Sequence, residues 1–300
     1  MGICAYNEGN NIGKLLQSIL HEQDFSEDSE ILVVCSGCTD NTADIVNLYA
    51  AEDSRVKPFF EKERKGKASA VNHILSNAIG DAIVFISGDT LPRKGTFPKL
   101  LSKLNQPKVG LVCGNPTPVN SSRSTVGRIV QLMWRFHGHV FEELNDAGLA
   151  RHASEAFCIR PSIVEKLPIG TVNDDAYLAI SIRKKGWLIK FCPDALISIC
   201  GPKTFKEYFQ QRRRVIFGHY QIRMLTGESP QYLVHMLPAH PFRTVRLALW
   251  LFTQYDLFVL SAFLVTEFMI NAVALFDFLL GRTHSQWSTL PSTKIVIPQS

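Results

Sequence analysis

Residues 81–90, DAIVFISGDT, pass from four consecutive large apolar residues into Ser87, Gly88 and Asp89. Such a run is typical of a strand buried on both faces, as in a parallel sheet covered by helices. Asp89 would then lie at the carboxyl end of that strand. In open α/β sheets this end binds ligands, and a carboxylate there can hold a divalent cation against a phosphate. Gly and Asp are also common turn formers, so the three residues taken alone fit a plain turn equally well.

The segments before this strand alternate between strand and helix patterns. A strand around Ile3 is followed by apolar residues at helical spacing from Ile12 to Leu20. Next come a strand at 30–35, a helix at 43–51 that Asp40 can cap, a strand at 56–60 and a helix at 65–75. This β-α-β-α-β-α-β order predicts an α/β fold with a doubly wound sheet and a crevice above its carboxyl ends.

The rest of the chain continues with strands and longer helices. We expect strands at 109–113, 189–192 and 195–200, and helices at 124–144, 173–185 and 205–224. No GxGxxG follows the first strand and no GxxxxGK[ST] occurs, so a nucleotide would be held in another way. His137 and His139 are two positions apart and face different sides of a helix, which argues against a ligand pair.

Composition and charge narrow the class of protein. The 300 residues are 46% hydrophobic, enough for one catalytic-size domain plus an appendage. The net charge of +5 is spread over clusters at 62–67, 183–185 and 212–214 rather than over one basic face, which argues against nucleic-acid binding. Such clusters suit anionic phosphates or a membrane surface.

The cysteines favour a reducing compartment. There are seven, an odd number, several of them within apolar runs, as expected of reduced thiols in a cytoplasmic setting. Cys35 and Cys38 have CxxC spacing without a second pair, so two loop thiols are favoured over a metal or redox site. The first residues have no signal-peptide pattern and open within the first predicted strand.

Two polar clusters lie in the second half of the chain. Asp174 and Asp175 fall in the first turn of a helix that Gly186 ends, where acidic residues suit the helix dipole. The same pair could instead orient a substrate and accept a proton. Farther on, three consecutive arginines at 212–214 fan over more than half of a helix, and Arg is suited to forked contact with a diphosphate.

In order and spacing, residues 3–218 resemble a family-2 inverting glycosyltransferase of the GT-A fold. CAYNE at 4–8 is similar to the family's Pro-x-Tyr-Asn-Glu, and KASAVN at 67–72 to Lys-Ala-Gly-Ala-Leu-Asn. SGD at 87–89 falls at the Asp-x-Asp metal motif, and NDDAYL at 173–178 resembles Thr-Glu-Asp-x-x-Leu. QRRRV at 211–215 resembles Gln-x-x-Arg-Trp of the membrane-associated β-glycosyltransferases.

The resemblance implies roles for individual residues. Donor binding falls to Tyr6, Glu8, Ser36, Lys67, Gly88 and Asp89. Asp89 would hold Mg²⁺ or Mn²⁺, and Asp175 would be the catalytic base. The diphosphate and acceptor end falls to Asp174, Gln211, Arg212 and Arg214.

Three positions depart from the family pattern. Ser36 stands where the family usually has an Asp that reads the base, and Ser87 replaces the first Asp of Asp-x-Asp. Val215 replaces the Trp of the last motif, a residue associated with processive polymer synthesis. These departures motivate one alternative, a membrane scaffold that kept the fold and lost the chemistry.

The C-terminal region carries a membrane signal. Residues 257–280 are helical in type and long enough to span a bilayer, but Glu267 must face protein, form an ion pair or be protonated. Residues 238–252 suit an interfacial helix. Basic residues precede the apolar run, which places the catalytic domain on the cytoplasmic side. The alternative is a buried dimerisation helix in a homo-oligomer.

These expectations combine into one functional hypothesis. A GT-A-type doubly wound mixed sheet at 1–204 is followed by a helical segment at 205–241 and apolar membrane-associated helices and a tail at 242–300. The protein would transfer a sugar from a nucleotide-diphospho-sugar to a hydroxyl of a lipid-linked or glycan acceptor. A sugar-phosphate nucleotidyltransferase is the other enzyme alternative, but the loop at 4–9 lacks the Gly-rich, basic sequence that a triphosphate requires.

Overall fold

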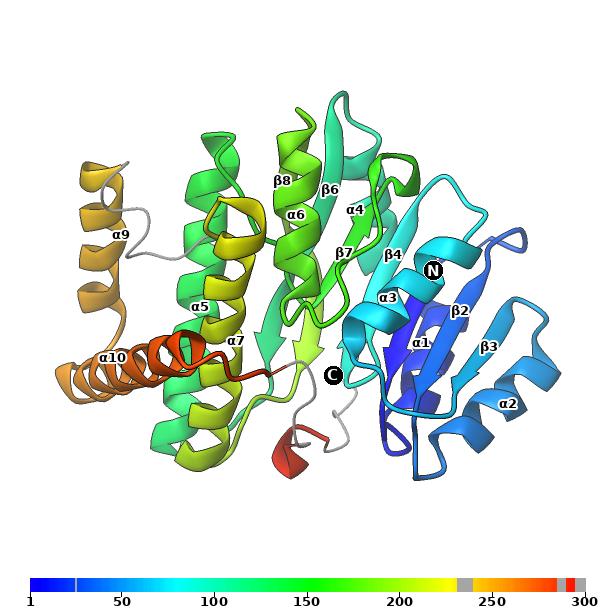
Figure 1. The fold of residues 1–300 in the computed structure, drawn as a ribbon, viewed down its shortest axis with the longest axis horizontal. Coiled ribbons are helices and arrows are strands. Elements are labelled where there is room, and N and C mark those ends of the chain that lie inside the picture. The colour runs from blue at the N-terminus through cyan, green and yellow to red at the C-terminus, as the bar shows by residue number, and fades with distance from the viewer. Residues whose placement is uncertain (25, 231–239, 285–289, 295–300) are drawn as a thin grey trace.

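One mixed sheet organises the molecule (Figure 1). The computed structural model describes residues 1–300 apart from 25, 231–239, 285–289 and 295–300. Among the described residues the sheet has eight strands in the order β3-β2-β1-β4-β7-β6-β8-β5. Their bounds are β1 Gly2–Ala5, β2 Ile31–Ser36, β3 Val56–Glu61, β4 Ile83–Ser87, β5 Thr90–Pro92, β6 Val109–Pro118, β7 Ala156–Ile159 and β8 Leu188–Ile199.

The first half of the sheet is parallel, as predicted. β1 lies between β2 and β4, with Ile3 opposite Val33 on one side and Ile86 on the other. Residues 83–86 of β4 are all buried, which confirms the reading of this run as a strand covered on both faces. The carboxyl ends of these strands therefore meet at one edge of the sheet.

The second half is where the sheet becomes mixed. β7 runs antiparallel to both β4 and β6, while β8 is parallel to β6 and antiparallel to the short β5. The two strands predicted at 189–192 and 195–200 are one continuous strand, β8, whose register shifts opposite Cys113 and Asn115. Such a bulge interrupts the alternation of side chains, which explains why the sequence looked like two strands.

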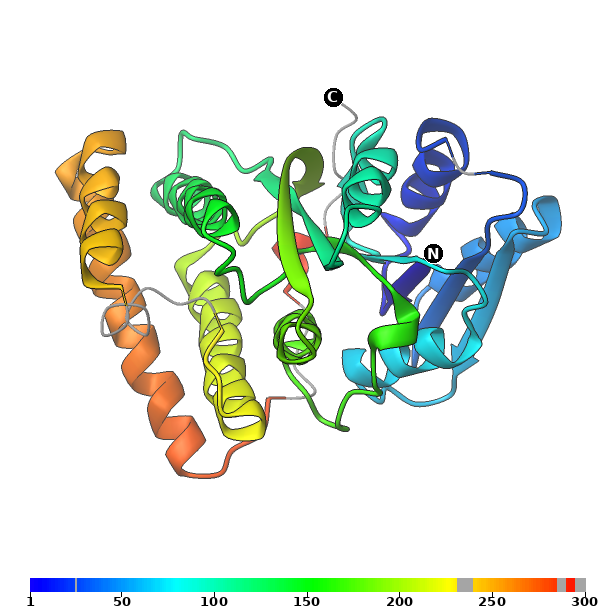
Figure 2. The same ribbon diagram turned by 90° about the horizontal axis from the view of Figure 1, so that it is seen from above.

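Helices cover both faces of the sheet (Figure 2). α1 and α4 contribute to the apolar cluster on one face, and α3 and α6 contribute to the cluster on the other. The helices of this part of the chain are α1 Ile12–Glu22, α2 Thr42–Glu52, α3 Lys67–Asn77, α4 Thr96–Leu104, α5 Thr125–Asp146 and α6 Asp174–Lys184. The doubly wound arrangement is thereby confirmed, whereas α4 and β7 were not predicted.

Three long helices follow the sheet. α7 spans Phe205–Thr226, α9 spans Pro241–Gln254 and α10 spans Leu257–Leu279. α10 packs along α7 and shares an apolar cluster with α7 and α5, at the end of the molecule opposite β3 (Figure 1). Within the described residues, α10 is the one helix long and apolar enough to cross a membrane. The predicted start of the interfacial helix at Pro238 lies outside the described residues.

Candidate active site

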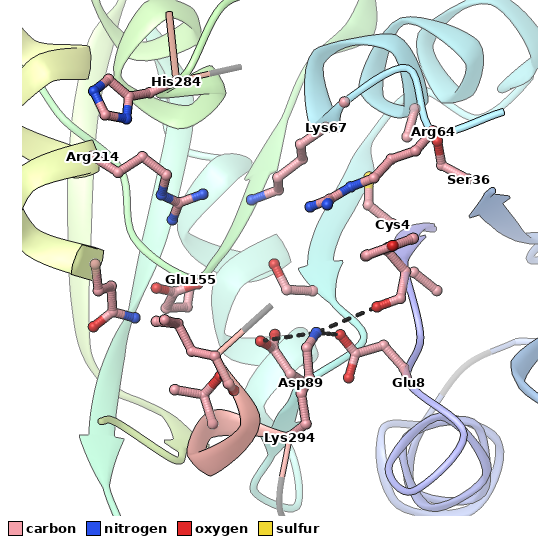
Figure 3. Close-up of a pocket in the computed structure, with 18 of the residues that line it drawn as sticks. Cys4, Glu8, Ser36, Arg64, Lys67, Asp89, Glu155, Arg214, His284 and Lys294 are labelled. Carbon is pink, nitrogen blue, oxygen red and sulfur yellow. Dashed lines mark hydrogen bonds and ion pairs between the residues drawn. The ribbon is translucent and has the colours of Figure 1, made fainter. Parts of the chain in front are cut away.

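A cavity of about 370 Å³ opens at the carboxyl ends of β1, β2 and β4 (Figure 3). Residues of α7 and of the C-terminal segment 290–294 complete its lining. Seven of the predicted site residues line it, namely Tyr6, Glu8, Ser36, Lys67, Asp89, Gln211 and Arg214. Five segments distant in sequence thus meet at the edge where ligands of open α/β sheets bind.

Tyr6 lies in the loop between β1 and α1. The guanidinium of Arg64, from the loop after β3, lies 3.9 Å from the centre of the Tyr6 ring. The Asn7 side chain holds this loop by accepting a hydrogen bond of 2.8 Å from the backbone N–H of Thr39. Arg64 was predicted only as part of a basic cluster, and its pairing with Tyr6 depends on a contact between two loops.

Ser36 is already engaged by neighbouring protein atoms. Its hydroxyl donates to a carboxylate oxygen of Glu61 and accepts a bond of 3.3 Å from the backbone N–H of Lys65. It therefore holds the end of β3 and the loop that carries Arg64. Ser36 thereby orders the wall of the pocket that it lines.

Lys67 opens α3 and points into the cavity. Gly66 before it has a φ of 89°, which an L side chain rarely adopts, so the turn into the helix requires glycine. The Lys67 Nζ atom lies 3.4 Å from Oδ2 of Asp174. Burial lowers the pKa of Lys67, but the nearby charges of Asp174 and Glu155 outweigh it, and the pKa lies above its usual value.

Asp89 follows β4 directly. The backbone N–H of Gly88 donates to the carbonyl of Cys4 at 3.1 Å, extending the pairing of β4 with β1. A Cβ on Gly88 would lie 2.8 Å from Cγ of Glu8, so glycine lets Glu8 approach the end of β4. Burial raises the pKa of Asp89, while the charges of Lys67 and Arg214 act in the opposite direction.

Glu155 is a pocket residue that the sequence analysis missed. Ala156 pairs with Ile86 in the antiparallel ladder, so Glu155 falls opposite Ser87 at the end of β4. Burial raises the pKa of Glu155 to about 7, and the negative charge of Asp89 adds to this effect. A lone acidic residue just before an apolar strand was the available signal. Its meaning depends on β7 running antiparallel to β4, which the sequence alone did not show.

The two acidic residues of α6 lie beside the cavity rather than in its lining. Asp174 is 3% exposed, and burial raises its pKa against the charge of Lys67. Asp175 Oδ2 lies 3.5 Å from Nε2 of His152. Gly218 of α7 allows this helix start to pack closely, since a Cβ there would meet the Asn173 side chain at 2.4 Å.

The three consecutive arginines of α7 have three different surroundings. Arg212 makes a two-pronged contact with Glu267 of α10, at 2.9 and 2.8 Å, and is not part of the pocket lining. Arg212 was predicted at the diphosphate, and the structure instead pairs it with α10. Arg213 lines the pocket and binds Asp277 at 2.7 Å. Arg214 points into the cavity, where burial lowers its pKa and nearby carboxylates, Glu155 first, oppose that shift.

The C-terminal segment completes the pocket wall next to the ends of β1 and β4. Leu290, Thr293 and Lys294 line the cavity. The Lys294 ammonium contacts a carboxylate oxygen of Glu8, lies 3.8 Å from Oδ2 of Asp89 and donates to the carbonyl of Tyr6 at 3.4 Å (Figure 3).

The cavity offers few protein ligands for a divalent cation. In the described part of the chain, no group of three or more His, Cys, Asp and Glu side chains has the geometry of a metal site. Asp89 nevertheless offers a carboxylate beside two cations, Lys67 and Arg214, that suit a diphosphate. Mg²⁺ is commonly bound by one or two carboxylates plus substrate phosphates, so the residues present fit such an ion.

Two relatives found by sequence comparison are named for sugar transfer or for polysaccharide synthesis. The chain is 27% identical over 283 residues to the probable glycosyltransferase YdaM of Bacillus subtilis, covering 90% of this chain and 64% of the relative. It is 25% identical over 246 residues to poly-beta-1,6-N-acetyl-D-glucosamine synthase of Staphylococcus aureus, covering 77% and 58%. The chain therefore spans about three fifths of the length of these relatives.

Solved structures show the same fold. The mannosyltransferase PcManGT of Pyrobaculum calidifontis, in complex with GDP-Man and Mn²⁺, superposes with a TM-score of 0.65 at 21% identity, over 93% of this chain and 86% of that one. A TarS fragment of S. aureus with UDP-GlcNAc gives 0.53 at 13% identity, over 93% and 91%. The mixed α/β arrangement is thus of the GT-A type.

A family profile matches the first part of the chain. The profile described as glycosyl transferase family 2 matches residues 1–167, more than half of the chain, and includes β1 to β7 with Tyr6, Lys67 and Asp89. The protein belongs to glycosyl transferase family 2.

Proposed function

We propose that this protein transfers a sugar from a nucleotide-diphospho-sugar, with inversion, to a hydroxyl of a lipid-linked or glycan acceptor. The observation that carries the proposal is the meeting of Lys67, Arg214 and Asp89 in one cavity beside the Asp174–Asp175 pair. Relatives and solved structures named for sugar transfer, some with UDP- or GDP-sugars, support it.

The donor fits the cavity in one orientation. The stacked Tyr6 ring and Arg64 guanidinium offer a flat surface for the nucleoside at the β1 side. Lys67 and Arg214 then face the diphosphate, with Arg213 at the rim and Gln211 nearby. Arginine and lysine in a closed cavity hold phosphate oxygens by charge-assisted bonds, stronger than neutral ones.

The chemical step needs a base for the acceptor and relief of charge on the leaving group. Asp175 accepts the proton of the acceptor hydroxyl as the new bond forms, and Asp174 keeps Lys67 directed at the donor. Arg214 stabilises the negative charge that grows on the departing nucleoside diphosphate. Mg²⁺ or Mn²⁺ held by Asp89 would supply further charge neutralisation there, the role of metal ions in such transfers.

A membrane surface is the proposed setting. Glu267 and Asp277 of α10 face the arginines of α7, while large apolar side chains on the other side of α10 are exposed. These exposed residues are Leu257, Phe258, Leu264, Val265, Phe268, Met269, Leu275, Phe276 and Leu279. α9 adds the exposed apolar residues Phe242, Val245, Leu249 and Phe252. With both helices at a membrane, the pocket would lie at the cytoplasmic surface close to a lipid-linked acceptor.

A donor-hydrolysis screen tests the proposal. The 300-residue protein with Mn²⁺ is incubated with UDP-glucose, UDP-GlcNAc and GDP-mannose in separate reactions, and released nucleoside diphosphate is measured. We expect release from one donor and a higher melting temperature with that donor, because a ligand that binds the folded state alone stabilises it. A chain that neither hydrolyses nor is stabilised by any nucleotide-sugar would favour the scaffold alternative.

A further inference from the structure

Two carboxylates from different elements converge on one positive charge. Oε1 of Glu8, in the loop after β1, contacts the Lys294 ammonium, and Oδ2 of Asp89, after β4, lies 3.8 Å from the same nitrogen (Figure 3). Glu8 is 4% exposed, and its second oxygen, Oε2, has no hydrogen-bond partner among the described residues. A buried carboxylate in this state requires a cation.

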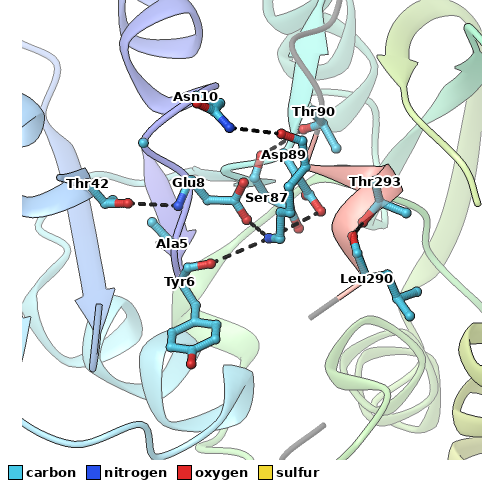
Figure 4. Close-up of polar contacts among 12 residues, drawn as sticks. Ala5, Tyr6, Glu8, Asn10, Thr42, Ser87, Asp89, Thr90, Leu290 and Thr293 are labelled. Atoms are coloured by element: carbon cyan, nitrogen blue, oxygen red, sulfur yellow. Dashed lines mark hydrogen bonds and ion pairs between the residues drawn. The ribbon is translucent and has the colours of Figure 1, made fainter. Parts of the chain in front are cut away.

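The position of Glu8 is fixed by its backbone. The Glu8 N–H donates to Thr42 Oγ1 at 2.7 Å, and the Glu8 carbonyl accepts 2.8 Å bonds from the N–H groups of Asn11 and Ile12. Gly88 leaves room for the side chain to lie against the end of β4. The Glu8 backbone is therefore positioned by contacts that do not involve Lys294, among them the bond to Thr42 (Figure 4).

We propose that Glu8 and Asp89 together form a divalent-cation site, in which Glu8 supplies the second carboxylate that Ser87 does not, and that Lys294 occupies this site in the metal-free chain. The inference rests on the proposed function for the role of the ion. It departs from the expectation that Glu8 binds the donor directly. Oxygen ligands from two carboxylates, completed by phosphate oxygens, suit Mg²⁺ or Mn²⁺.

The segment that carries Lys294 is anchored separately. The Ser292 hydroxyl and backbone N–H both bind the Glu207 carboxylate at the start of α7, and Cys200 Sγ lies 3.3 Å from the Ser292 carbonyl. Lys294 is thus presented to Glu8 by a short tethered strap, residues 290–294. An ammonium and a divalent ion cannot share the same two carboxylates, so metal binding requires Lys294 to withdraw, and the two cations compete.

Binding of Mn²⁺ alone tests the site without donor or acceptor. Free Mn²⁺ is followed by its electron paramagnetic resonance signal in full-length wild type and in Lys294→Met, Glu8→Gln and Glu8→Gln/Lys294→Met variants. The control is Lys94→Met, which replaces an exposed lysine outside the pocket lining. We expect Lys294→Met to bind Mn²⁺ about tenfold more tightly than wild type, because its competitor is gone. Adding Glu8→Gln to that variant should weaken binding at least tenfold.

The outcomes separate the parts of the inference. Equal Mn²⁺ affinity in wild type and Lys294→Met would show that Lys294 does not compete, and equal affinity with and without Glu8→Gln would remove Glu8 from the site. No Mn²⁺ binding by Lys294→Met would overturn the site as a whole. Thermal melts of each variant exclude misfolding, and a chain that binds Mn²⁺ as expected but hydrolyses no nucleotide-sugar would refute the proposed function while leaving this site standing.

Discussion

The ammonium of Lys67 lies 3.4 Å from the Asp174 carboxylate and joins the start of α3 to the start of α6 beside the pocket. Asp174 is 3% exposed, so removing the Lys67 ammonium leaves a buried negative charge without this positively charged neighbour. Lys67→Met should lower the free energy of unfolding by about 3 kcal/mol, the usual cost of breaking a buried pair. Urea unfolding of wild type and Lys67→Met measures this difference in the free energy of unfolding. Adding Asp174→Asn should recover part of the loss, and an unchanged stability in Lys67→Met would contradict the pairing.

Asp175→Asn should abolish transfer and leave donor affinity nearly unchanged, because a base that acts on the acceptor contributes to the chemical step alone. The expected loss in kcat is about 10²- to 10⁴-fold. Single-turnover kinetics and donor titration measure the two quantities separately. Glu142→Gln, at an exposed position on α5, is the matched control. Near-normal turnover in Asp175→Asn would remove Asp175 from the mechanism.

Asp89→Ala should weaken donor binding in Mn²⁺ and make it insensitive to a chelator, since the ion would bridge this carboxylate and the diphosphate. Calorimetric titration with and without EDTA measures the effect. Wild type should lose affinity on chelation and the variant should show almost no further loss. If chelation weakened both proteins equally, another residue would be the principal ligand.

The raised pKa of Glu155 predicts that the free energy of unfolding depends on pH. Its pKa rises from 4.5 to about 7 in the folded protein, so the folded state binds more protons than the unfolded state between these values. Stability therefore falls as pH rises through this window, by at most about 3 kcal/mol. Glu155→Gln should remove that fall. Unfolding free energies of both proteins at pH 5 and pH 8, in EDTA, provide the comparison, and parallel pH curves would contradict the prediction.

The apolar face of α10 predicts binding to lipid vesicles. Phe268 and Phe276 are 76% and 58% exposed, and replacing both by Glu should weaken flotation with phosphatidylglycerol vesicles about tenfold or more. Leu48→Glu changes an exposed apolar residue of α2 and should have no effect. Equal flotation of all three proteins would return α10 to the role of a subunit contact, which analytical ultracentrifugation would then detect.

Local patterns predicted much of the fold, and the residues that escaped prediction depend on tertiary contacts. The apolar run before Asp89 and the helix starts at Lys67 and Asp174 are encoded by neighbouring residues, so their elements could be placed in advance. Glu155 became a pocket residue only through the antiparallel register of β7 with β4. The separation of Arg212 from Arg214 likewise depends on Glu267, more than fifty residues away.

The three consecutive arginines of α7, Arg212 to Arg214, also constrain how the pocket could be oriented relative to a bilayer. Arg212 and Arg213 bind Glu267 and Asp277, two carboxylates of α10, while the next residue, Arg214, reaches the cavity. Consecutive residues of a helix advance by about 1.5 Å, so anchor and pocket are joined within a single turn of α7. With α10 at a lipid surface, two arginine–carboxylate ion pairs, rather than a flexible tether, would set the height and tilt of the cavity mouth above that surface.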